Sequence, residues 1–402
     1  MKYDFDCLID RCGTDCSKWD AREALFGSKD VLPMWVADMD FPIAKPIVDA
    51  LQRRMEHEIY GYAQTPTSVV EAVVERMKRK YDWKVDPEWL VFTPGVVPAL
   101  YASVKAFTHP GDEVIIQEPV YGPFRSSVTA NGCLIVNNQL KLINGHYEID
   151  FADLAAKFKP RGGGLRPASP RVRLMLLCQP HNPVGRVWSR EELRRMGDIV
   201  IGNDAIMVSD EIHCELLFRG FKHLPFAAIS EEFAQSSIVC MAPSKTFNLA
   251  GLRASTIIIP NKKIRERFNA ARAGIMPGPN VFGLIGLEAA YRYGDEWLEQ
   301  LLEYLQGNLE FLVEYFEARI PEIKVIRPEG TYLVWLDCRG LGMDDANLRT
   351  LFREKALVGL EDGYTFGAGG SGFQRMNIAC PRPTLKDALG RIERAVSQVV
   401  KH

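Results

Sequence analysis

The sequence predicts an α/β protein with a large domain built around a mostly parallel, doubly wound sheet and with a smaller α+β domain. Between residues 90 and 259, short continuous apolar runs alternate with helical stretches. This pattern is typical of parallel strands that helices cover on both faces. Beyond Pro321 the order changes to two strands, a helix, a Gly-rich loop, a further strand and a closing helix, which indicates a second, α+β unit. The chain of 402 residues is long enough for both.

The segment before residue 90 is expected to contain an arm and two helices. Residues 1–30 show no sustained period and predict an extended arm with a short helix. A short strand and a loop carrying Asp38 and Asp40 follow over residues 33–42. Apolar residues at helical spacing predict the two helices, over residues 45–58 and 68–80.

The large sheet is predicted from short apolar runs bounded by polar residues. Its expected strands begin at Leu90 and continue with 113–117, 133–136, 173–178, 205–213 including its end, 238–242 and 254–259. Helices are expected up to Phe107, over 122–132 and over 189–201, where Ser189 is the N-cap. Residues 159–171, rich in Gly, Pro and Arg, predict a surface insertion.

The remaining residues predict a helical stretch and then the smaller domain. Residues 282–293 and 296–318 are expected to be helical, with a break near Gly294 and Asp295. Three further strands and two helices follow: strands 324–326, 331–337 and 373–378, and helices 344–355 and 385–400.

Composition and charge exclude several classes of function. The net charge of −2 gives no electrostatic reason to bind nucleic acid or a membrane surface. No apolar run reaches the roughly 18 residues of a membrane span, and residues 1–6 lack the apolar segment of a secretory signal, so we expect a cytoplasmic protein. Nine scattered cysteines, without paired Cys-x-x-Cys spacing, predict reduced thiols and no metal site.

Unusual polar residues follow the predicted strands. They are the Thr93-Pro94-Gly95 turn, Tyr121, Asn182, Asp210 with His213, and Lys245. Each has an ordinary structural explanation: a turn, a packing aromatic, a salt bridge, a core histidine or a solvated lysine. Ligands of doubly wound sheets bind beyond the carboxyl ends of the strands. The shared edge therefore favours a ligand site over five separate structural roles.

The chemistry of these residues points to one cofactor. A lysine placed where a buried strand opens into a loop can be desolvated, which lowers its pKa and makes its amine a nucleophile. Such amines form Schiff bases, most often with pyridoxal 5'-phosphate (PLP). PLP also needs a carboxylate against its pyridine nitrogen and a phosphate site, and a helix beginning after Thr93-Pro94-Gly95 offers the latter.

Three segments resemble the class I/II aminotransferase family, PLP fold type I: residues 182–185, 210–213 and 244–253. Within it the chain resembles the MalY/PatB-type cystathionine β-lyase (C–S lyase) branch, through residues 33–41, 61–62, 209–213, 244–248 and 375–382. The resemblance implies a seven-stranded-type sheet. We expect an N-terminal arm with part of the small domain over 1–48, a large PLP-binding domain over 49–287 and a small α+β domain over 288–402.

The resemblance also implies roles for individual residues. Lys245 would be the Schiff-base lysine, Asp210 the partner of the pyridine nitrogen and Tyr121 the stacking and catalytic ring. Cofactor contacts would also come from Asn182 and His213 at the phenolic oxygen, and from Gly95, Val96, Val97, Ser244 and Arg253 at the phosphate. Arg375, Asp38 and Tyr62 would bind the substrate, with Tyr62 reaching the cofactor site of the other subunit in a homodimer. Ala242 departs from the serine common in aminotransferases.

The leading hypothesis from the sequence is a PLP-dependent C–S β-lyase that converts cystathionine or cysteine S-conjugates to pyruvate, ammonia and a thiol. An aminotransferase using the same site is the alternative. A PLP-binding regulatory protein without catalytic activity is a third possibility, because binding motifs do not guarantee turnover. The motifs alone do not separate these activities.

Overall fold

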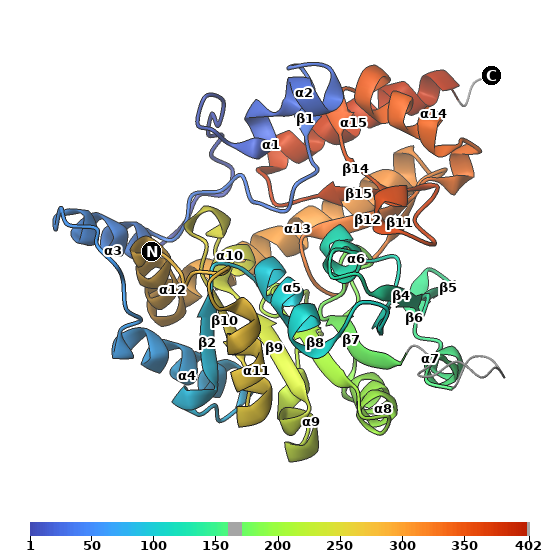
Figure 1. Ribbon diagram of the computed structural model, residues 1–402. Helices are drawn as coiled ribbons and strands as arrows, with labels where there is room; N and C mark the ends of the chain where they lie inside the picture. The colour runs from blue at the N-terminus through green and yellow to red at the C-terminus, as the bar shows by residue number, and fades with distance from the viewer. Residues whose placement is uncertain (160–170, 400–402) are drawn as a thin grey trace.

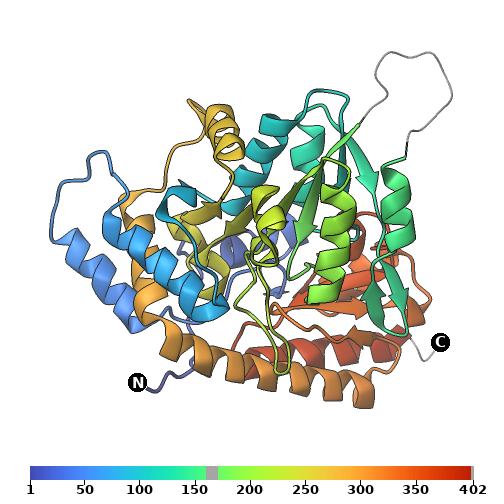
Figure 2. The same ribbon diagram turned by 90° about the horizontal axis from the view of Figure 1, so that it is seen from below.

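A computed structural model describes residues 1–159 and 171–399, so all of the predicted insertion at 159–171 except its two end residues lies outside the described residues (Figures 1 and 2). Its centre is a seven-stranded sheet of order β2-β10-β9-β8-β7-β3-β4. The strands are β2 (Leu90–Thr93), β3 (Glu113–Ile116), β4 (Leu134–Asn137), β7 (Val172–Cys178), β8 (Ile206–Asp210), β9 (Ser237–Met241) and β10 (Ser255–Ile258). All neighbouring pairs are parallel except those of β10, which is antiparallel to β2 and β9. The predicted fold class is confirmed.

The central strands are buried on both faces because successive side chains point in opposite directions. In β9, Ile238 packs in one core cluster with Leu100, and Val239 packs in another with Leu287. This explains why the strand has a continuous apolar run instead of alternating polar and apolar residues.

Helices cover both faces of this sheet (Figure 1). The helices of this part of the chain are α3 (Lys45–Met55), α4 (Thr67–Tyr81), α5 (Val96–Phe107), α6 (Gly122–Thr129), α7 (Phe151–Lys157), α8 (Arg190–Ile201), α9 (Glu231–Gln235), α10 (Pro243–Thr246), α11 (Lys262–Arg272) and α12 (Val281–Tyr293). The sequence missed α11 because Phe268 is its one fully buried side chain, which leaves little periodicity to detect. Ser189 caps α8 as predicted, in a capping box with Glu192.

A second, antiparallel sheet of order β11-β12-β15-β14 forms the smaller layer. Its strands are β11 (Lys324–Ile326), β12 (Leu333–Asp337), β14 (Glu361–Asp362) and β15 (Phe373–Asn377). Its helices are α13 (Asp295–Arg319), α14 (Asp345–Thr350) and α15 (Arg382–Val399), and Figure 2 shows α13 beside α15. The predicted break at Gly294 separates α12 from α13, and the Phe247 ring packs so close to this residue that a side chain would collide with it.

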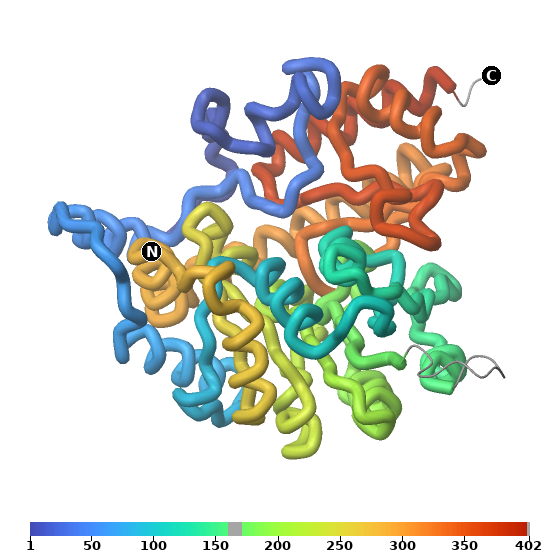
Figure 3. The backbone as a smooth tube through the Cα atoms, in the orientation of Figure 1, coloured from blue at the N-terminus to red at the C-terminus, as the bar shows by residue number. Residues whose placement is uncertain are grey.

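The N-terminal arm packs on the smaller sheet's side of the molecule (Figure 3). It contains α1 (Ser17–Asp20), α2 (Arg22–Phe26) and β1 (Leu32–Pro33), and β1 pairs in parallel with β13 (Val358–Gly359). A hairpin of β5 (Lys141–Ile143) and β6 (His146–Glu148) was not expected from the sequence. The domain limits at residues 48 and 287 stay a prediction.

Candidate active site

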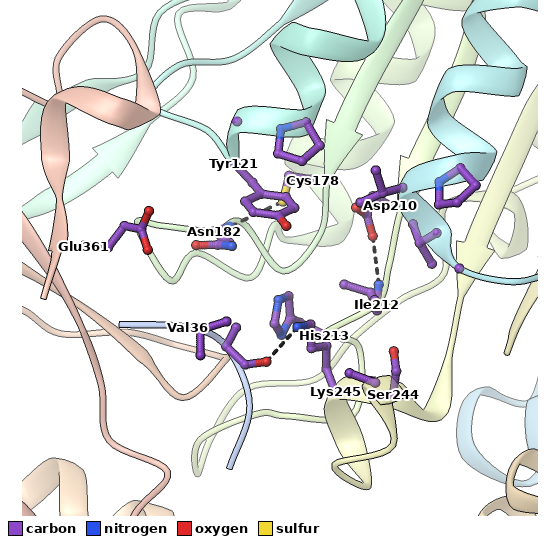
Figure 4. A pocket seen from close by; sticks show the side chains of 18 of the residues that line it. Val36, Tyr121, Cys178, Asn182, Asp210, Ile212, His213, Ser244, Lys245 and Glu361 are labelled. Carbon is purple, nitrogen blue, oxygen red and sulfur yellow. Dashed lines mark hydrogen bonds between the residues drawn. The ribbon is translucent and has the colours of Figure 1, made fainter. Parts of the chain in front are cut away.

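A cavity of about 570 Å³ opens where the predicted residues converge. It lies beyond the carboxyl ends of β7, β8 and β9, beside the start of α5 (Figure 4). Of the predicted site residues, those that line it are Gly95, Val96, Val97, Tyr121, Asn182, Asp210, His213, Ser244, Lys245, Arg253 and Arg375. The strand-end rule therefore located the cavity from the sequence.

Lys245 lies in the short helix α10, directly after β9. Its Nζ donates a hydrogen bond of 2.6 Å to the backbone oxygen of Ala37. Burial and, to a smaller extent, the positive charge of Arg375 lower the pKa of Lys245 to about 8, although Asp38 and Asp210 act in the opposite direction. An amine with this pKa has a neutral fraction of roughly one fifth near pH 7.4, far more than an ordinary lysine, and the neutral form is the one that acts as a nucleophile or a base.

Asp210 ends β8 with its side chain directed into the cavity (Figure 4). The residue is 5% exposed, and its Oδ1 accepts a hydrogen bond of 3.1 Å from the backbone N–H of Ile212. Burial raises the pKa of Asp210 to about 7. Within residues 1–159 and 171–399 no cation forms an ion pair with this carboxylate. A buried carboxylate of this kind suits a ligand that brings its own positive charge.

His213 follows Asp210 by three residues and is 4% exposed. Its Nδ1 has no hydrogen-bond partner among the described residues. Burial, with Lys245 and Arg375 nearby, lowers the pKa of His213 to about 3, so the ring is neutral. A neutral ring with an unpartnered nitrogen can exchange a hydrogen bond with a bound ligand.

Arg375 comes from β15 of the smaller sheet and is 3% exposed. Its Nη1 donates to Asn182 Oδ1 at 3.0 Å, and its Nη2 donates to the backbone oxygen of Trp35 at 2.9 Å. The guanidinium also lies over the Phe366 ring, 4.9 Å from its centre. These contacts fix a planar cation in the cavity, which is the geometry that recognises a carboxylate with two hydrogen bonds.

The start of α5 forms the opposite end of the cavity. The first backbone N–H groups of a helix have no partner within it and carry a partial positive charge, which favours anions. Gly95 is the N-cap, and Val96 and Val97 open the helix. Arg253 adds a positive charge to the cavity. It forms no ion pair with any residue that the structure describes. Ala242, the position at which aminotransferases commonly have a serine, does not line the cavity.

Residues 35–37 form a wall of the cavity that the sequence did not reveal. Asn377 Nδ2 donates to the backbone oxygens of Val36 and Asp38, at 2.7 and 2.6 Å. Tyr332 donates its hydroxyl to Ala37 O at 3.0 Å, the oxygen that also accepts from Lys245. Glu361 and Phe366 of the smaller sheet's side also line the cavity and were missed. The signal for Glu361 is weak because β14 is two residues long, and Phe366 lies in a short 3-10 helix that follows it.

A family model described as aminotransferase class I and II matches residues 29–392. The chain belongs to the aminotransferase class I and II family. It is 44% identical over 395 residues to cystathionine beta-lyase PatB of Bacillus subtilis (strain 168), with 98% of this chain and 100% of that protein covered. The match extends over both sheets and the arm, so the predicted resemblance to this branch is confirmed.

Solved structures of other proteins share the fold of this chain over nearly its whole length. Cystalysin from Treponema denticola, which contains PLP, superposes with a TM-score of 0.94 at 36% identity, with 99% of this chain and 100% of that chain covered. A PLP-bound C–S lyase from Staphylococcus hominis superposes with a TM-score of 0.91 at 33% identity, covering 98% of each chain. Both likenesses confirm PLP fold type I for this family member.

Two predicted residues of this aminotransferase-family chain lie outside the cavity lining. Asp38 points toward the arm, where its carboxylate pairs with Arg11 at 2.8 Å and lies 3.7 Å from Lys18 Nζ. Asp38 therefore does not line the cavity, and its predicted substrate contact stays a prediction. Tyr62 is fully exposed in the loop between α3 and α4.

Among the described helices, none has the length and apolar character needed to cross a membrane.

Proposed function

We propose that this protein is a PLP-dependent C–S β-lyase that cleaves cystathionine or other cysteine S-conjugates to pyruvate, ammonia and a thiol. The observation that carries the proposal is the convergence of Lys245, Asp210 and Arg375 on one cavity. The full-length relative from Bacillus subtilis is named as a cystathionine beta-lyase, which favours elimination of sulfur over transfer of the amino group.

The residues present fit PLP. Asp210 is a buried carboxylate without a cationic partner among the described residues, and His213 has an unpartnered Nδ1. The start of α5 with Ser244 and Arg253 provides an anion site at the other end of the same cavity. When bound, PLP supplies an aromatic ring that withdraws electrons from the substrate Cα.

Each residue then has a defined task. We propose that Asp210 holds a proton on the pyridine nitrogen and that Asn182 and His213 contact the phenolic oxygen. Tyr121 would cover the ring, and Arg375 would bind the substrate α-carboxylate. Lys245 would attach the cofactor and, once displaced by the substrate amine, take the Cα proton, for which a pKa of about 8 is well matched. The β-thiolate would leave with the electron pair of the C–S bond.

We further propose a homodimer in which Tyr62 reaches the neighbouring site. The last residue of α3 and the loop after it present large apolar side chains to solvent: Met55 at 58%, Ile59 at 70%, Tyr60 at 52% and Tyr62 at 110% exposure. Figure 3 shows this loop projecting from the body of the chain. Exposed apolar side chains gathered on one loop mark an interaction surface.

A cytoplasmic location and domain boundaries at residues 48 and 287 also remain part of the proposal.

Incubation with cystathionine and no keto acid tests the activity. The lyase releases pyruvate over many turnovers, whereas an aminotransferase stops after one half-turnover and leaves pyridoxamine phosphate. Lys245→Ala should abolish both turnover and the visible absorbance band of the lysine-bound cofactor. Lys263→Ala, an exposed lysine of α11, is the matched control and should change neither. Absorbance without pyruvate in the unaltered protein would support the non-catalytic PLP-binding alternative.

A further inference from the structure

The charged residues of the cavity leave one group without a task. Among the described residues, the charged side chains that line it are Asp210, Lys245, Arg253, Arg375 and Glu361. The proposed function uses the first four for the cofactor and the substrate α-carboxylate. Glu361 is a fifth, negative group, and none of those tasks needs it.

Glu361 stands at the start of β14, directly across from Arg375 of β15. Its Oε2 lies 3.5 Å from Arg375 Nη2, and its side chain is 30% exposed. Figure 4 shows Glu361 on the opposite side of the cavity from Asp210, with its carboxylate directed inward. The side chain therefore faces the part of the cavity that lies away from the pyridine-nitrogen site.

Arg375 does not depend on Glu361 for its position. Its shorter hydrogen bonds go to Asn182 Oδ1 at 3.0 Å and to Trp35 O at 2.9 Å. The next residue, Asp362, shows the contrast: it is 3% exposed and bonds with Arg349 and Arg353. Asp362 therefore has structural partners. Among the described residues, Glu361 has one side-chain contact, at 3.5 Å, with the guanidinium that the proposed function assigns to the substrate carboxylate.

The charge balance changes when substrate enters. A carboxylate bound to Arg375 takes up the positive charge that balances Glu361 in the free site. A partly buried carboxylate that loses its counter-ion favours the arrival of another cation. The substrate can supply that cation only from the group attached to sulfur, because its α-amine is committed to the cofactor.

We propose that Glu361 is a specificity residue that selects cysteine S-conjugates carrying a positive charge, such as an ammonium, on the sulfur substituent. This inference rests on the proposed lyase function. It assigns to Glu361 the recognition of the leaving thiol, and it leaves the proton transfer at Lys245 unchanged.

Three conjugates of similar size and different charge test the inference: S-(2-aminoethyl)-cysteine, S-propyl-cysteine and S-(carboxymethyl)-cysteine. Pyruvate release is measured for the holoenzyme and for Glu361→Gln, which keeps the shape and removes the charge. We expect the unaltered enzyme to prefer the aminoethyl conjugate and to disfavour the carboxymethyl conjugate. Glu361→Gln should lower kcat/KM for the aminoethyl conjugate roughly fivefold, mainly through KM, and leave the propyl conjugate unchanged. Glu354→Gln, an exposed glutamate elsewhere on the smaller sheet's side, is the matched control.

An equal loss on all three conjugates would overturn the inference, because Glu361 would then act through Arg375. It would also be overturned if the unaltered enzyme did not prefer the aminoethyl conjugate, or if Glu361→Gln left kcat/KM for that conjugate unchanged. If Glu361→Gln does not fold, the salt dependence of the unaltered enzyme decides: KM should rise with ionic strength for the aminoethyl conjugate and stay level for the propyl conjugate. Pyruvate from none of the three would instead contradict the proposed lyase function itself.

Discussion

The cavity has two walls of different construction. The sheet wall, defined by Asn182, Asp210, His213 and Lys245, consists of side chains at the ends of neighbouring elements of the large sheet. The arm wall, defined by residues 35–37 with Glu361 and Arg375, joins segments more than 300 residues apart. The sheet wall holds buried groups with shifted pKa values and unused bonding capacity. The arm wall is dense in hydrogen bonds. Reactivity and positioning are thus divided between the two walls.

The arm wall depends on ion pairs that do not touch the cavity. Lys18 is fully buried, and its Nζ binds Asp40 Oδ2 at 2.7 Å. Arg11 pairs with Asp40 at 2.6 Å and with Asp38 at 2.8 Å. These pairs flank residues 35–37, whose backbone oxygens accept hydrogen bonds from Lys245 and Arg375. We therefore expect changes in the arm to act on the site through backbone position.

The largest expected effect comes from removing charge in the sheet wall. Asp210→Asn should lower the rate of pyruvate release by roughly 10²–10³-fold, because the ring nitrogen loses its stabilising charge. Asp38→Asn is the matched change on the arm side and should cost less than roughly tenfold, because this carboxylate touches Arg11 and not the cavity. Steady-state assays of both variants make the comparison, and equal losses would contradict the division between the walls.

The pH dependence of the stability of the cofactor-free protein tests the same difference between the two walls. The pKa of Asp210 rises from its unfolded value to about 7 in the folded chain because of burial. A raised pKa stabilises the fold at low pH, and this contribution is lost as the pH rises through the folded pKa. The free energy of unfolding should therefore fall between about pH 4 and about pH 7, by on the order of 2–4 kcal/mol relative to Asp210→Asn. Urea unfolding at stepped pH measures it, and parallel curves for the two proteins would refute the burial argument.

Lys18→Met tests the arm wall at its buried ion pair. Removing one partner of a buried pair should destabilise the fold by about 3 kcal/mol, with Arg11 and Trp19 still bonded to Asp40. Displacement of residues 35–37 should raise KM for the amino acid roughly tenfold, with a smaller change in kcat. Thermal unfolding and steady-state kinetics give the two values. Lys29→Met, an exposed lysine on the same arm, should change neither. A loss of stability with KM unchanged would show a structural role alone.

The smallest expected effect is at Tyr332. Tyr332→Phe removes the hydroxyl that shares Ala37 O with Lys245, a net change of about 1 kcal/mol. With this competitor gone, the Ala37 oxygen should accept a stronger hydrogen bond from the charged form of Lys245. The pKa of Lys245 should therefore rise, and the acidic limb of the pH–rate profile should move to higher pH. Tyr315→Phe, on α13 and bonded to Glu393, is the control. A limb that stays in place would show that the shared oxygen does not tune the lysine.

Local sequence patterns were sufficient for the sheet wall. Short apolar runs predicted the strands, and the carboxyl ends of parallel strands meet at one edge, so these two rules placed Asn182, Asp210 and Lys245 together. The resemblance to the family then added Arg375. The strand β14 escaped detection because it has two residues, and the weakly periodic α11 escaped detection because Phe268 is its one fully buried side chain.

The fold class and the cofactor could be predicted from the sequence, and eleven of the predicted site residues line one cavity, because those features depend on periodicity and on residues close to strand ends. Only the tertiary structure decided that Asp38 turns toward Arg11 and that Glu361 turns toward Arg375. Neighbouring residues of an extended segment point to opposite sides, so a register difference of one position decides which side chain enters a cavity. That register is set by contacts between segments far apart in the chain, which no local pattern contains.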